Sequence, residues 1–188
     1  MKSADVIKKV IQTFDQDVIF IFGNGRTSTE AHYIKDSSNH FYMLGSMGCA
    51  SLIGLGMAIS RTDKNFVVIE GDGNILMNPG SIITIGSMAP PNLLHLVIDN
   101  GIYETTGGQK TITNDWNMVD FARKCGYKIS NEISFHQIDE LKENLFQRIG
   151  PIFTKIIVKP GILNDAPVFD KNPSKIKEDI LKTLTKIK

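Results

Sequence analysis

Short apolar runs alternate with segments of helical periodicity along most of the chain. Residues 2–14, KSADVIKKVIQTF, place apolar side chains at helical spacing and predict an amphipathic helix. Five short apolar runs predict extended segments of the kind that is buried on both faces of a parallel sheet. These runs span residues 18–22, 41–44, 66–70, 93–98 and 153–158.

Helices are predicted in the segments that separate these runs. Thr27 or Ser28 is the expected N-cap of the helix that follows the first run. Further helices are predicted over residues 47–60, over the segment between 71 and 91 with a break at Pro79, over 116–124, over 138–147 and in the Lys-rich tail from Pro173. This strand and helix order predicts an α/β fold, a three-layer sandwich with a mostly parallel sheet, in which residues 1–188 form a single domain.

Composition narrows the class of ligand. The chain has 188 residues, of which 41% are hydrophobic and 22% are charged, and its net charge is +1. Lys and Arg are spread along the chain, so we expect no nucleic-acid partner. No apolar run is long enough for a signal or transmembrane segment, and we therefore expect a cytoplasmic protein with no membrane partner. Cys49 and Cys125 are expected to be reduced thiols.

Glycines and polar residues follow three of the predicted strands. They form Gly23-Asn24-Gly25, Gly71-Asp72-Gly73-Asn74 and Asp99-Asn100-Gly101. Ligands of open parallel sheets bind at the carboxyl ends of the strands, where glycines let backbone amides approach a phosphate. A carboxylate beside a phosphate needs a cation between them, so Asp72 indicates bound Mg²⁺.

Each of these features also has a simpler interpretation. Gly-Asp-Gly after a strand is often a tight turn, and Met47 is as well explained as a core methionine at a helix start. The spacing from Gly71-Asp72-Gly73 to Asn100, on two adjacent strands, instead matches the signature of thiamine-diphosphate enzymes. We expect Asp72 to be an exposed strand-end carboxylate, so that Asp72→Ala abolishes Mg²⁺-dependent cofactor binding and leaves the fold intact.

Two longer segments extend this resemblance. Residues 41–58, FYMLGSMGCASLIGLGMA, and 71–109, beginning GDGNILMNPGS, are similar to the cofactor-binding halves of thiamine-diphosphate-dependent decarboxylases of the sulfopyruvate and phosphonopyruvate type. With the first strand, the resemblance covers about residues 15–160. It implies a thiamine-diphosphate-binding fold with thiamine diphosphate and Mg²⁺ as cofactors. The cofactor-binding residues that it implies are Gly25, Gly45, Ser46, Met47, Gly71, Asp72, Gly73, Asn74, Asn100, Ile102, Tyr103 and Thr105.

The resemblance assigns a role to several of these residues. Asp72 and Asn100 bind the metal through their side chains, and Ile102 does so through its carbonyl. The amides of Gly73, Asn74 and Thr105 cradle the diphosphate. On the Gly-Ser-Met-Gly turn, the Gly45 carbonyl accepts a hydrogen bond from the aminopyrimidine. Met47 separates the two rings of the cofactor, which suits an unbranched and polarizable side chain.

The same resemblance implies that the chain lacks one group that is essential for catalysis. The family activates its cofactor with a Glu from a pyrimidine-binding domain, and that domain is absent here. Glu104 is a weak candidate for a catalytic role, while Glu30 and Glu70 are poor substitutes. We therefore expect a heteromer with a pyrimidine-domain alpha subunit, with at least two of each chain. His40 is a further candidate proton carrier, whereas His95 is expected to be a core residue with its hydrogen bonds satisfied.

The resemblance implies a subunit of a 2-keto acid decarboxylase that is active only with its partner. A separate short chain favours the beta subunit of the sulfopyruvate type, which forms sulfoacetaldehyde and CO₂ in coenzyme M biosynthesis. A phosphonopyruvate decarboxylase-type enzyme and a non-catalytic cofactor-binding module remain open alternatives. A Rossmann-type nucleotide site is disfavoured, because no G-x-G-x-x-G follows the first strand. Residues 105–113, TTGGQKTIT, are expected to form a mobile lid.

Overall fold

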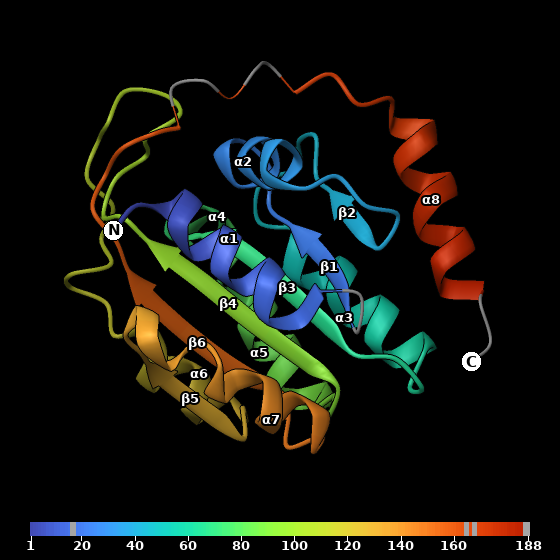
Figure 1. Ribbon diagram of the computed structural model, residues 1–188. Coiled ribbons are helices and arrows are strands. Elements are labelled where there is room, and N and C mark those ends of the chain that lie inside the picture. Colours follow the sequence, from blue (N-terminus) through green and yellow to red (C-terminus); the bar gives the residue numbers. More distant parts are fainter. Residues whose placement is uncertain (16–17, 164–165, 167–168, 186–188) are drawn as a thin grey trace.

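A six-stranded parallel sheet forms the centre of the computed structural model, which describes residues 1–15, 18–163, 166 and 169–185 (Figure 1). The strands lie in the order β2-β1-β3-β4-β6-β5. Their bounds are β1 Ile19–Phe22, β2 His40–Tyr42, β3 Phe66–Gly71, β4 Leu93–Asp99, β5 Ile129–Glu132 and β6 Ile152–Ile157. The chain order reverses between β1 and β3, which is where open α/β sheets place their ligands.

Helices cover both faces of the sheet. The helices are α1 Ser3–Phe14, α2 Arg26–Ile34, α3 Ala50–Ser60, α4 Asp72–Met77, α5 Gly80–Met88, α6 Met118–Cys125, α7 Glu140–Phe146 and α8 Pro173–Thr185, with a short 3-10 helix, η2, at Phe135–Gln137. One core cluster joins the sheet to α1, α2 and α7, and a second joins it to α3, α5 and α6. In Figure 1 the first group lies in front of the sheet and the second behind it.

Alternate side chains of each central strand enter opposite cores. In β3, Val67 and Ile69 belong to the cluster with α1, while Phe66 and Val68 belong to the cluster with α3. All four are fully buried, as the continuous apolar run of this strand predicts for a parallel sheet. The predicted α/β sandwich is therefore confirmed, and every strand pair in the sheet is parallel.

Two details of the predicted elements are wrong. Thr27 and Ser28 do not cap α2, because the helix begins at Arg26 with Gly25 at the N-cap position. Gly25 has φ +75°, a conformation that a Thr or Ser side chain would strain. Strand β5 was not predicted, because this four-residue edge strand is only partly buried and contains polar residues.

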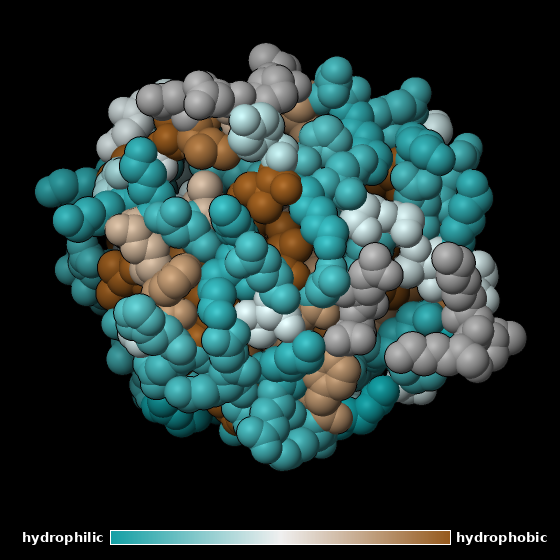
Figure 2. Space-filling model, in the orientation of Figure 1, coloured by the Kyte–Doolittle hydropathy of each residue, from teal (hydrophilic) through white to brown (hydrophobic). Residues whose placement is uncertain are grey.

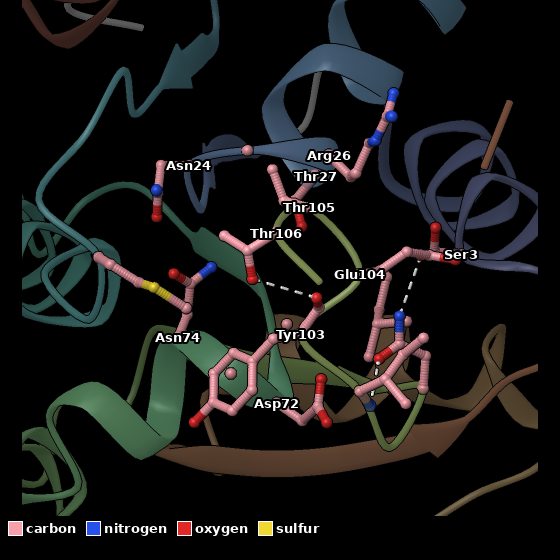
Figure 3. Close-up of a pocket in the computed structure, with 17 residues that line it drawn as sticks. Ser3, Asn24, Arg26, Thr27, Asp72, Asn74, Tyr103, Glu104, Thr105 and Thr106 are labelled. Atoms are coloured by element: carbon pink, nitrogen blue, oxygen red, sulfur yellow. Dashed lines mark hydrogen bonds between the residues drawn. The ribbon is translucent and has the colours of Figure 1, made fainter. Parts of the chain in front are cut away.

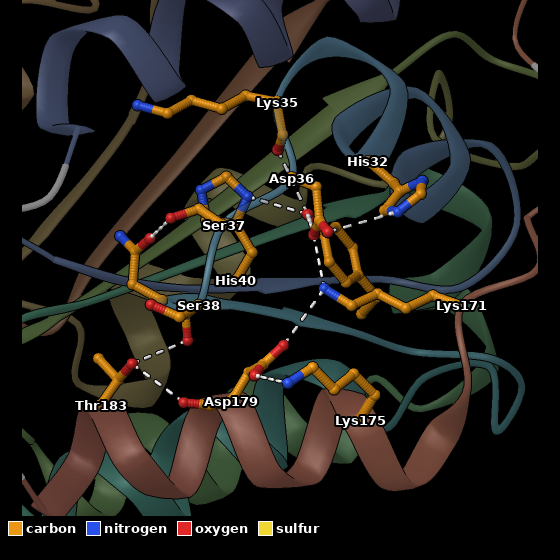
Figure 4. A network of polar contacts seen from close by, with 12 residues as sticks. His32, Lys35, Asp36, Ser37, Ser38, His40, Lys171, Lys175, Asp179 and Thr183 are labelled. Atoms are coloured by element: carbon orange, nitrogen blue, oxygen red, sulfur yellow. Dashed lines mark hydrogen bonds and ion pairs between the residues drawn. The ribbon is translucent and has the colours of Figure 1, made fainter.

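Helix α8 closes the outer edge of the sheet beside β2 (Figure 4). Lys171 connects Asp36, which follows α2, with Asp179 on α8, at distances of 2.6 and 3.7 Å from its Nζ atom. The Thr183 hydroxyl on α8 donates a hydrogen bond to the Ser38 carbonyl at 2.8 Å. These contacts lie between segments far apart in the chain, so they could not be predicted from local pattern.

A buried polar chain crosses the rear face of the sheet. His95 of β4 lies 2.7 Å from the Glu70 carboxylate of β3 through Nε2, and 3.0 Å from the Tyr127 hydroxyl through Nδ1. Both ring nitrogens have partners and the residue is fully buried, so the prediction of a satisfied core histidine is confirmed. Cys49 and Cys125 are free thiols, as expected. In the parts of the chain that are described, no helix has the length and apolarity needed to span a membrane.

His40 gives the fold a testable pH dependence. The residue is 1% exposed, and burial lowers its pKa from 6.5 to about 4. Between these two pH values the unfolded chain binds a proton that the folded chain excludes, so stability rises with pH across this window. We expect His40 to contribute a rise on the order of 2 kcal/mol in unfolding free energy between pH 4 and 6.5.

The difference between wild type and His40→Gln in urea unfolding at each pH isolates this contribution. His136→Asn is the matched control, because His136 is exposed and its replacement should leave the pH profile unchanged. A His40→Gln profile parallel to that of the wild type would contradict the assignment.

Candidate functional site

The ends of β1, β3 and β4 meet around one pocket of about 200 Å³ (Figure 3). Parallel pairing aligns Phe22 with Ile69 and Gly71 with Ile98, so the residues that follow the three strands share one edge. The turn after β1 contributes Asn24, α4 contributes Asp72 and Asn74, and the loop after β4 contributes Tyr103 and Thr105. The three glycine-rich turns that the sequence singled out are thus brought together.

A hydrogen-bonded chain of two threonines joins the carboxylates at the ends of β3 and β4. The Thr111 hydroxyl donates to Asp72 Oδ2 at 2.7 Å, and the Thr113 hydroxyl donates to Asp99 Oδ1 at 3.0 Å. The two hydroxyl oxygens lie 3.1 Å apart. Asp99 also faces Lys155 at 3.7 Å, whereas Asp72 pairs with no basic side chain among the described residues. Asp72 is therefore the carboxylate of this pair that lacks a positive partner.

Asp72 is buried, which corrects the expectation of an exposed strand-end carboxylate. Its side chain is 3% exposed, and this burial raises its pKa to about 6. The nearby charge of Asp99 raises the pKa further, while the hydrogen bond from Thr111 lowers it. A bound cation would compensate both the desolvation and the repulsion. The environment of Asp72 thus suits a metal ligand better than a turn residue.

The loop after β4 is organised by its own side chains. Asn100 Oδ1 accepts a hydrogen bond from the Ile102 amide at 3.1 Å, and Asn100 Nδ2 donates one to Glu104 at 3.1 Å. The other carboxylate oxygen of Glu104 accepts a hydrogen bond from the Gly161 amide. Glu104 lines the pocket, but both of its oxygens are engaged in holding this loop. This arrangement favours a positioning role for Glu104 over a role in proton transfer.

The first turn of α4 leaves a polar atom without a partner inside the protein. Asn74 is 5% exposed, and its Oδ1 atom has no hydrogen-bond partner. A Cβ atom on Gly73 would lie 2.8 Å from the Tyr103 ring and 3.2 Å from Met47 Cε, so only glycine lets these side chains approach. A buried amide without a partner costs free energy unless a ligand satisfies it.

The Gly-Ser-Met-Gly turn lies at the mouth of the pocket, before α3. Ser46 has φ +55°, an uncommon conformation for a residue with a side chain. Met47 is 37% exposed and lines the pocket, so it is not the core methionine of the alternative interpretation. Gly45 and Ser46 are exposed and are not among the pocket-lining residues. The structure thus brings Met47 to the site but leaves Gly45 and Ser46 at its rim.

Most of the predicted site residues line the same pocket. Those that do are Gly25, Met47, Gly71, Asp72, Gly73, Asn74, Asn100, Ile102, Tyr103 and Thr105. The prediction missed five further lining residues, which are Ser3, Arg26, Thr27, Ile98 and Thr106. It also missed the two threonines that bridge the carboxylates, Thr111 and Thr113. Thr111 and Thr113 are two residues apart, a spacing that in an extended segment places both side chains on one side.

The other proton-carrier candidates lie outside the pocket lining. His40 is buried against Tyr42, with its Nδ1 atom 3.0 Å from the hydroxyl. Glu30 is fully buried and accepts hydrogen bonds from the Ser3 hydroxyl at 2.6 Å and the Leu163 amide at 3.2 Å. Burial raises the pKa of Glu30. Glu70 is paired with His95. None of these three residues lines the pocket, and each has hydrogen-bond partners within the fold.

The donor set of the pocket fits a magnesium diphosphate. Oxygen ligands of Asp72 and Asn100 with a backbone carbonyl suit Mg²⁺, and the free Asn74 amide oxygen adds polarity to the cradle. No cluster of three or more His, Cys, Asp or Glu residues that could hold a metal occurs in the described segments.

Comparison with known proteins agrees with this geometry. The family described as thiamine pyrophosphate enzyme, C-terminal TPP binding domain, matches residues 22–153. The chain belongs to the thiamine pyrophosphate enzyme family. The matched range includes all three turns around the pocket, so the site lies within the part of the chain that defines the family.

Two relatives of this thiamine pyrophosphate enzyme domain differ in length. The chain is 40% identical over 162 residues to sulfopyruvate decarboxylase subunit beta of Methanocaldococcus jannaschii, covering 86% of the chain and 84% of that protein. It is 35% identical over 161 residues to phosphonopyruvate decarboxylase of Streptomyces viridochromogenes, covering 84% of the chain. The chain spans 40% of the length of that second relative.

Two solved structures share this fold at low sequence identity. The 2-oxoglutarate:ferredoxin oxidoreductase from Magnetococcus marinus aligns with a TM-score of 0.67 and 18% identity, covering 87% of this chain and 64% of that one. Benzoylformate decarboxylase from Polynucleobacter necessarius aligns with a TM-score of 0.65 and 14% identity, covering 89% and 34%. At these identities the likeness establishes the fold alone.

Asp72 and Asp99 offer a matched test of the site. We expect Asp72→Asn to abolish Mg²⁺-dependent binding of thiamine diphosphate while the melting temperature stays constant or rises, because a buried charge is removed. Asp99→Asn should retain Mg²⁺-dependent binding but lower the unfolding free energy by about 1 kcal/mol, since it removes the partner of Lys155. Calorimetric titration and thermal unfolding check both variants. Unfolding of Asp72→Asn would show that Asp72 is a structural turn residue.

Proposed function

We propose that the chain is the diphosphate- and Mg²⁺-binding subunit of a thiamine-diphosphate-dependent 2-keto acid decarboxylase. The observation that carries this proposal is the convergence of Asp72, Asn100 and the free Asn74 amide in one pocket. The identity to beta subunits of sulfopyruvate decarboxylase, 33–40% over most of the chain, supports the reaction class. Residues 1–188 then act as a single cofactor-binding domain.

Each part of the pocket has a role in this proposal. Asp72 and Asn100 hold Mg²⁺ through their side chains, and Ile102 does so through its carbonyl. The turn at Gly25 and the backbone at Gly73 leave room for the diphosphate next to the metal. Glu104 keeps Asn100 in position through the hydrogen bond between their side chains. Bound thiamine diphosphate supplies the electron sink that decarboxylation of a 2-keto acid requires.

The remaining cofactor contacts involve the turn before α3. In the proposal the Gly45 carbonyl and Met47 contact the aminopyrimidine, with Ser46 between them. The exposure of Met47 supports this assignment, because the side chain is free to contact a ligand that enters from the rim. Tyr103 and Thr105 also line the pocket, and residues 105–113 are proposed to close over the bound cofactor.

A second chain is proposed to complete the site. Among the described residues, the carboxylates that line the pocket are Asp72, which is assigned to the metal, and Glu104, whose two oxygens hold the loop after β4, whereas the chemistry needs a carboxylate at the pyrimidine. The relatives named subunit beta imply an alpha-type partner for those enzymes. We therefore propose a heteromer with at least two of each chain, in which the partner carries the pyrimidine-binding domain and its Glu. The assembly is proposed to work in the cytoplasm.

Sulfopyruvate is the proposed substrate, with sulfoacetaldehyde and CO₂ as products in coenzyme M biosynthesis. Three beta subunits of sulfopyruvate decarboxylase match at 40%, 38% and 33% identity, and each match covers at least 84% of that protein. Phosphonopyruvate is the second candidate, because two phosphonopyruvate decarboxylases match at 35% and 38% identity. Both compounds are short 2-keto acids with a second anionic group.

Titration of thiamine diphosphate, with and without Mg²⁺, tests the split site. We expect weak or no binding to the chain alone and Mg²⁺-dependent binding after co-expression with an alpha-type chain. Release of CO₂ from sulfopyruvate, and more slowly from phosphonopyruvate, should then appear only in the mixture. Turnover by the chain alone would refute the split site. Binding without turnover of either compound would identify a non-catalytic cofactor-binding module.

Met47 gives a second prediction for the loaded heteromer. We expect Met47→Ala to weaken cofactor binding by only a few fold and to lower kcat by more, because the side chain orients the cofactor rather than holding its charge. Since Met47 is 37% exposed, its loss should cost less than about 1 kcal/mol of stability. Met47→Leu keeps the volume and should recover most of the turnover. A large fall in melting temperature would indicate a packing role instead.

A further inference from the structure

The guanidinium of Arg26 has no hydrogen-bond or ion-pair partner among the described residues. Its Nε atom is buried and has no acceptor there. Each of the other three arginines has an acceptor within the chain, and these pairs are Arg61–Asp63, Arg123–Asp120 and Arg148–Thr62. A guanidinium that is partly removed from water without an acceptor costs free energy, unless a ligand supplies the acceptor.

The surroundings of Arg26 distinguish it from an ordinary surface cation. Figure 2 shows that the face of the molecule that carries α1 is mostly hydrophilic, so a fully solvated cation would be unremarkable there. Arg26 is instead partly buried at the first position of α2. Glu30, about one helical turn further on, accepts hydrogen bonds from Ser3 and Leu163 and forms no ion pair with Arg26. The positive charge of Arg26 is thus left without a neutralising partner in the described chain.

Arg26 lines a second cavity in addition to the cofactor pocket. This cavity has a volume of about 560 Å³ and lies between α2, the end of β2 and the segment that leads into α8. It is called the α2 cavity below, and it is bounded by Arg26, Thr29, Met43, Leu44, Phe169 and Lys171, among others. The two cavities share Gly25, Arg26 and Thr105, so Arg26 lies at their junction.

The α2 cavity adjoins the reacting end of the site in the proposed function. Leu44, which lines this cavity, directly precedes Gly45, whose carbonyl is proposed to contact the aminopyrimidine. Figure 3 shows the guanidinium of Arg26 directed away from Asp72, where the metal and the diphosphate are proposed to lie. The charge of Arg26 is therefore placed for a ligand other than the diphosphate.

The charges that line the α2 cavity favour an anion. The charged lining residues are Arg26, Lys171 and Asp170, so cations outnumber carboxylates. Lys171 is already engaged by Asp36 at 2.6 Å and by Asp179 at 3.7 Å. Arg26 is the cation that remains for a ligand. A guanidinium offers parallel donors to a pair of oxygens on a phosphonate or a sulfonate, a geometry that a lysine lacks.

We propose that Arg26 binds the second anionic group of the 2-keto acid, the sulfonate or phosphonate, and so selects against keto acids with an uncharged tail. This inference rests on the proposed function for the reaction class. The carboxylate of such a substrate leaves as CO₂, whereas its second anionic group stays on the aldehyde product. One cation can therefore hold that group from binding of the substrate to release of the product.

Binding of β-sulfopropanoate tests this role without turnover. This dianion keeps the carboxylate and the sulfonate of sulfopyruvate and lacks its keto group. It is titrated calorimetrically into the heteromer loaded with thiamine diphosphate and Mg²⁺. We expect Arg26→Gln to weaken its binding by about 10- to 100-fold, because one charge-assisted contact is lost, and Arg26→Lys to recover part of it. In turnover, Arg26→Gln should raise KM for sulfopyruvate by a similar factor and change kcat less.

Two controls separate anion binding from a structural role. The affinity for thiamine diphosphate and the melting temperature of Arg26→Gln should stay at the wild-type values, because the guanidinium has no partner in the described fold. Arg123→Gln removes the same charge from an exposed position on α6, outside both cavities, and should bind the dianion like the wild type.

The outcomes distinguish this proposal from the proposed function. Equal binding of the dianion by wild type and Arg26→Gln, or no binding by the wild type, would overturn the role of Arg26. Loss of affinity for thiamine diphosphate in Arg26→Gln, with unchanged binding of the dianion, would also overturn it by assigning the guanidinium to the diphosphate. Weaker binding in Arg26→Gln but not in Arg123→Gln supports the proposal. If the wild-type heteromer then decarboxylates neither keto acid, only the proposed function fails.

Discussion

Parallel pairing of β1, β3 and β4 is the constraint on which the site depends. The backbone register between these strands brings their carboxyl ends to one edge, where the switch in chain order leaves space above the sheet. The same register forces Asp72 and Asp99 into proximity within a buried environment. The Thr113 hydroxyl and Lys155 both contact Asp99, whereas Asp72 has no basic partner among the described residues and is left for the proposed cation. The metal binding proposed for the pocket thus depends on strand order as much as on the identity of its residues.

The sequence predicted this edge well because its signals are local. Each buried strand is a continuous apolar run, and each turn after β1, β3 and β4 contains glycine next to a polar residue. Local pattern could not reveal contacts formed across the fold, such as Thr111 with Asp72, or Glu104 with Gly161. Local pattern also predicted an exposed Asp72, because it could not show that α4 and the loop after β4 bury this side chain. The edge strand β5 escaped notice because its polar residues, half exposed, lack the apolar run of a central strand.

In the proposed function, the protein is one half of a larger catalytic unit. The diphosphate side of the pocket is built from side chains whose positions are fixed by internal hydrogen bonds, as Asn100 and Glu104 illustrate. The opposite side, at Met47 and Leu44, is open and apolar. Rigid polar contacts thus lie where charge must be held, while the open rim lies where the proposed partner would contribute its own residues. Membership in the thiamine pyrophosphate enzyme family is consistent with this division.

The buried carboxylate of Asp72 also connects ligand binding with the lifetime of the folded chain. A ligand that binds the folded chain alone shifts the folding equilibrium in proportion to the logarithm of its concentration. Without a cation the folded chain must keep Asp72 desolvated beside Asp99, so the cofactor-free form is the less stable one. Cellular proteases remove chains according to the fraction that is unfolded. A ligand that brings a cation to Asp72 would therefore also slow the loss of the chain to proteases, because it lowers the unfolded fraction.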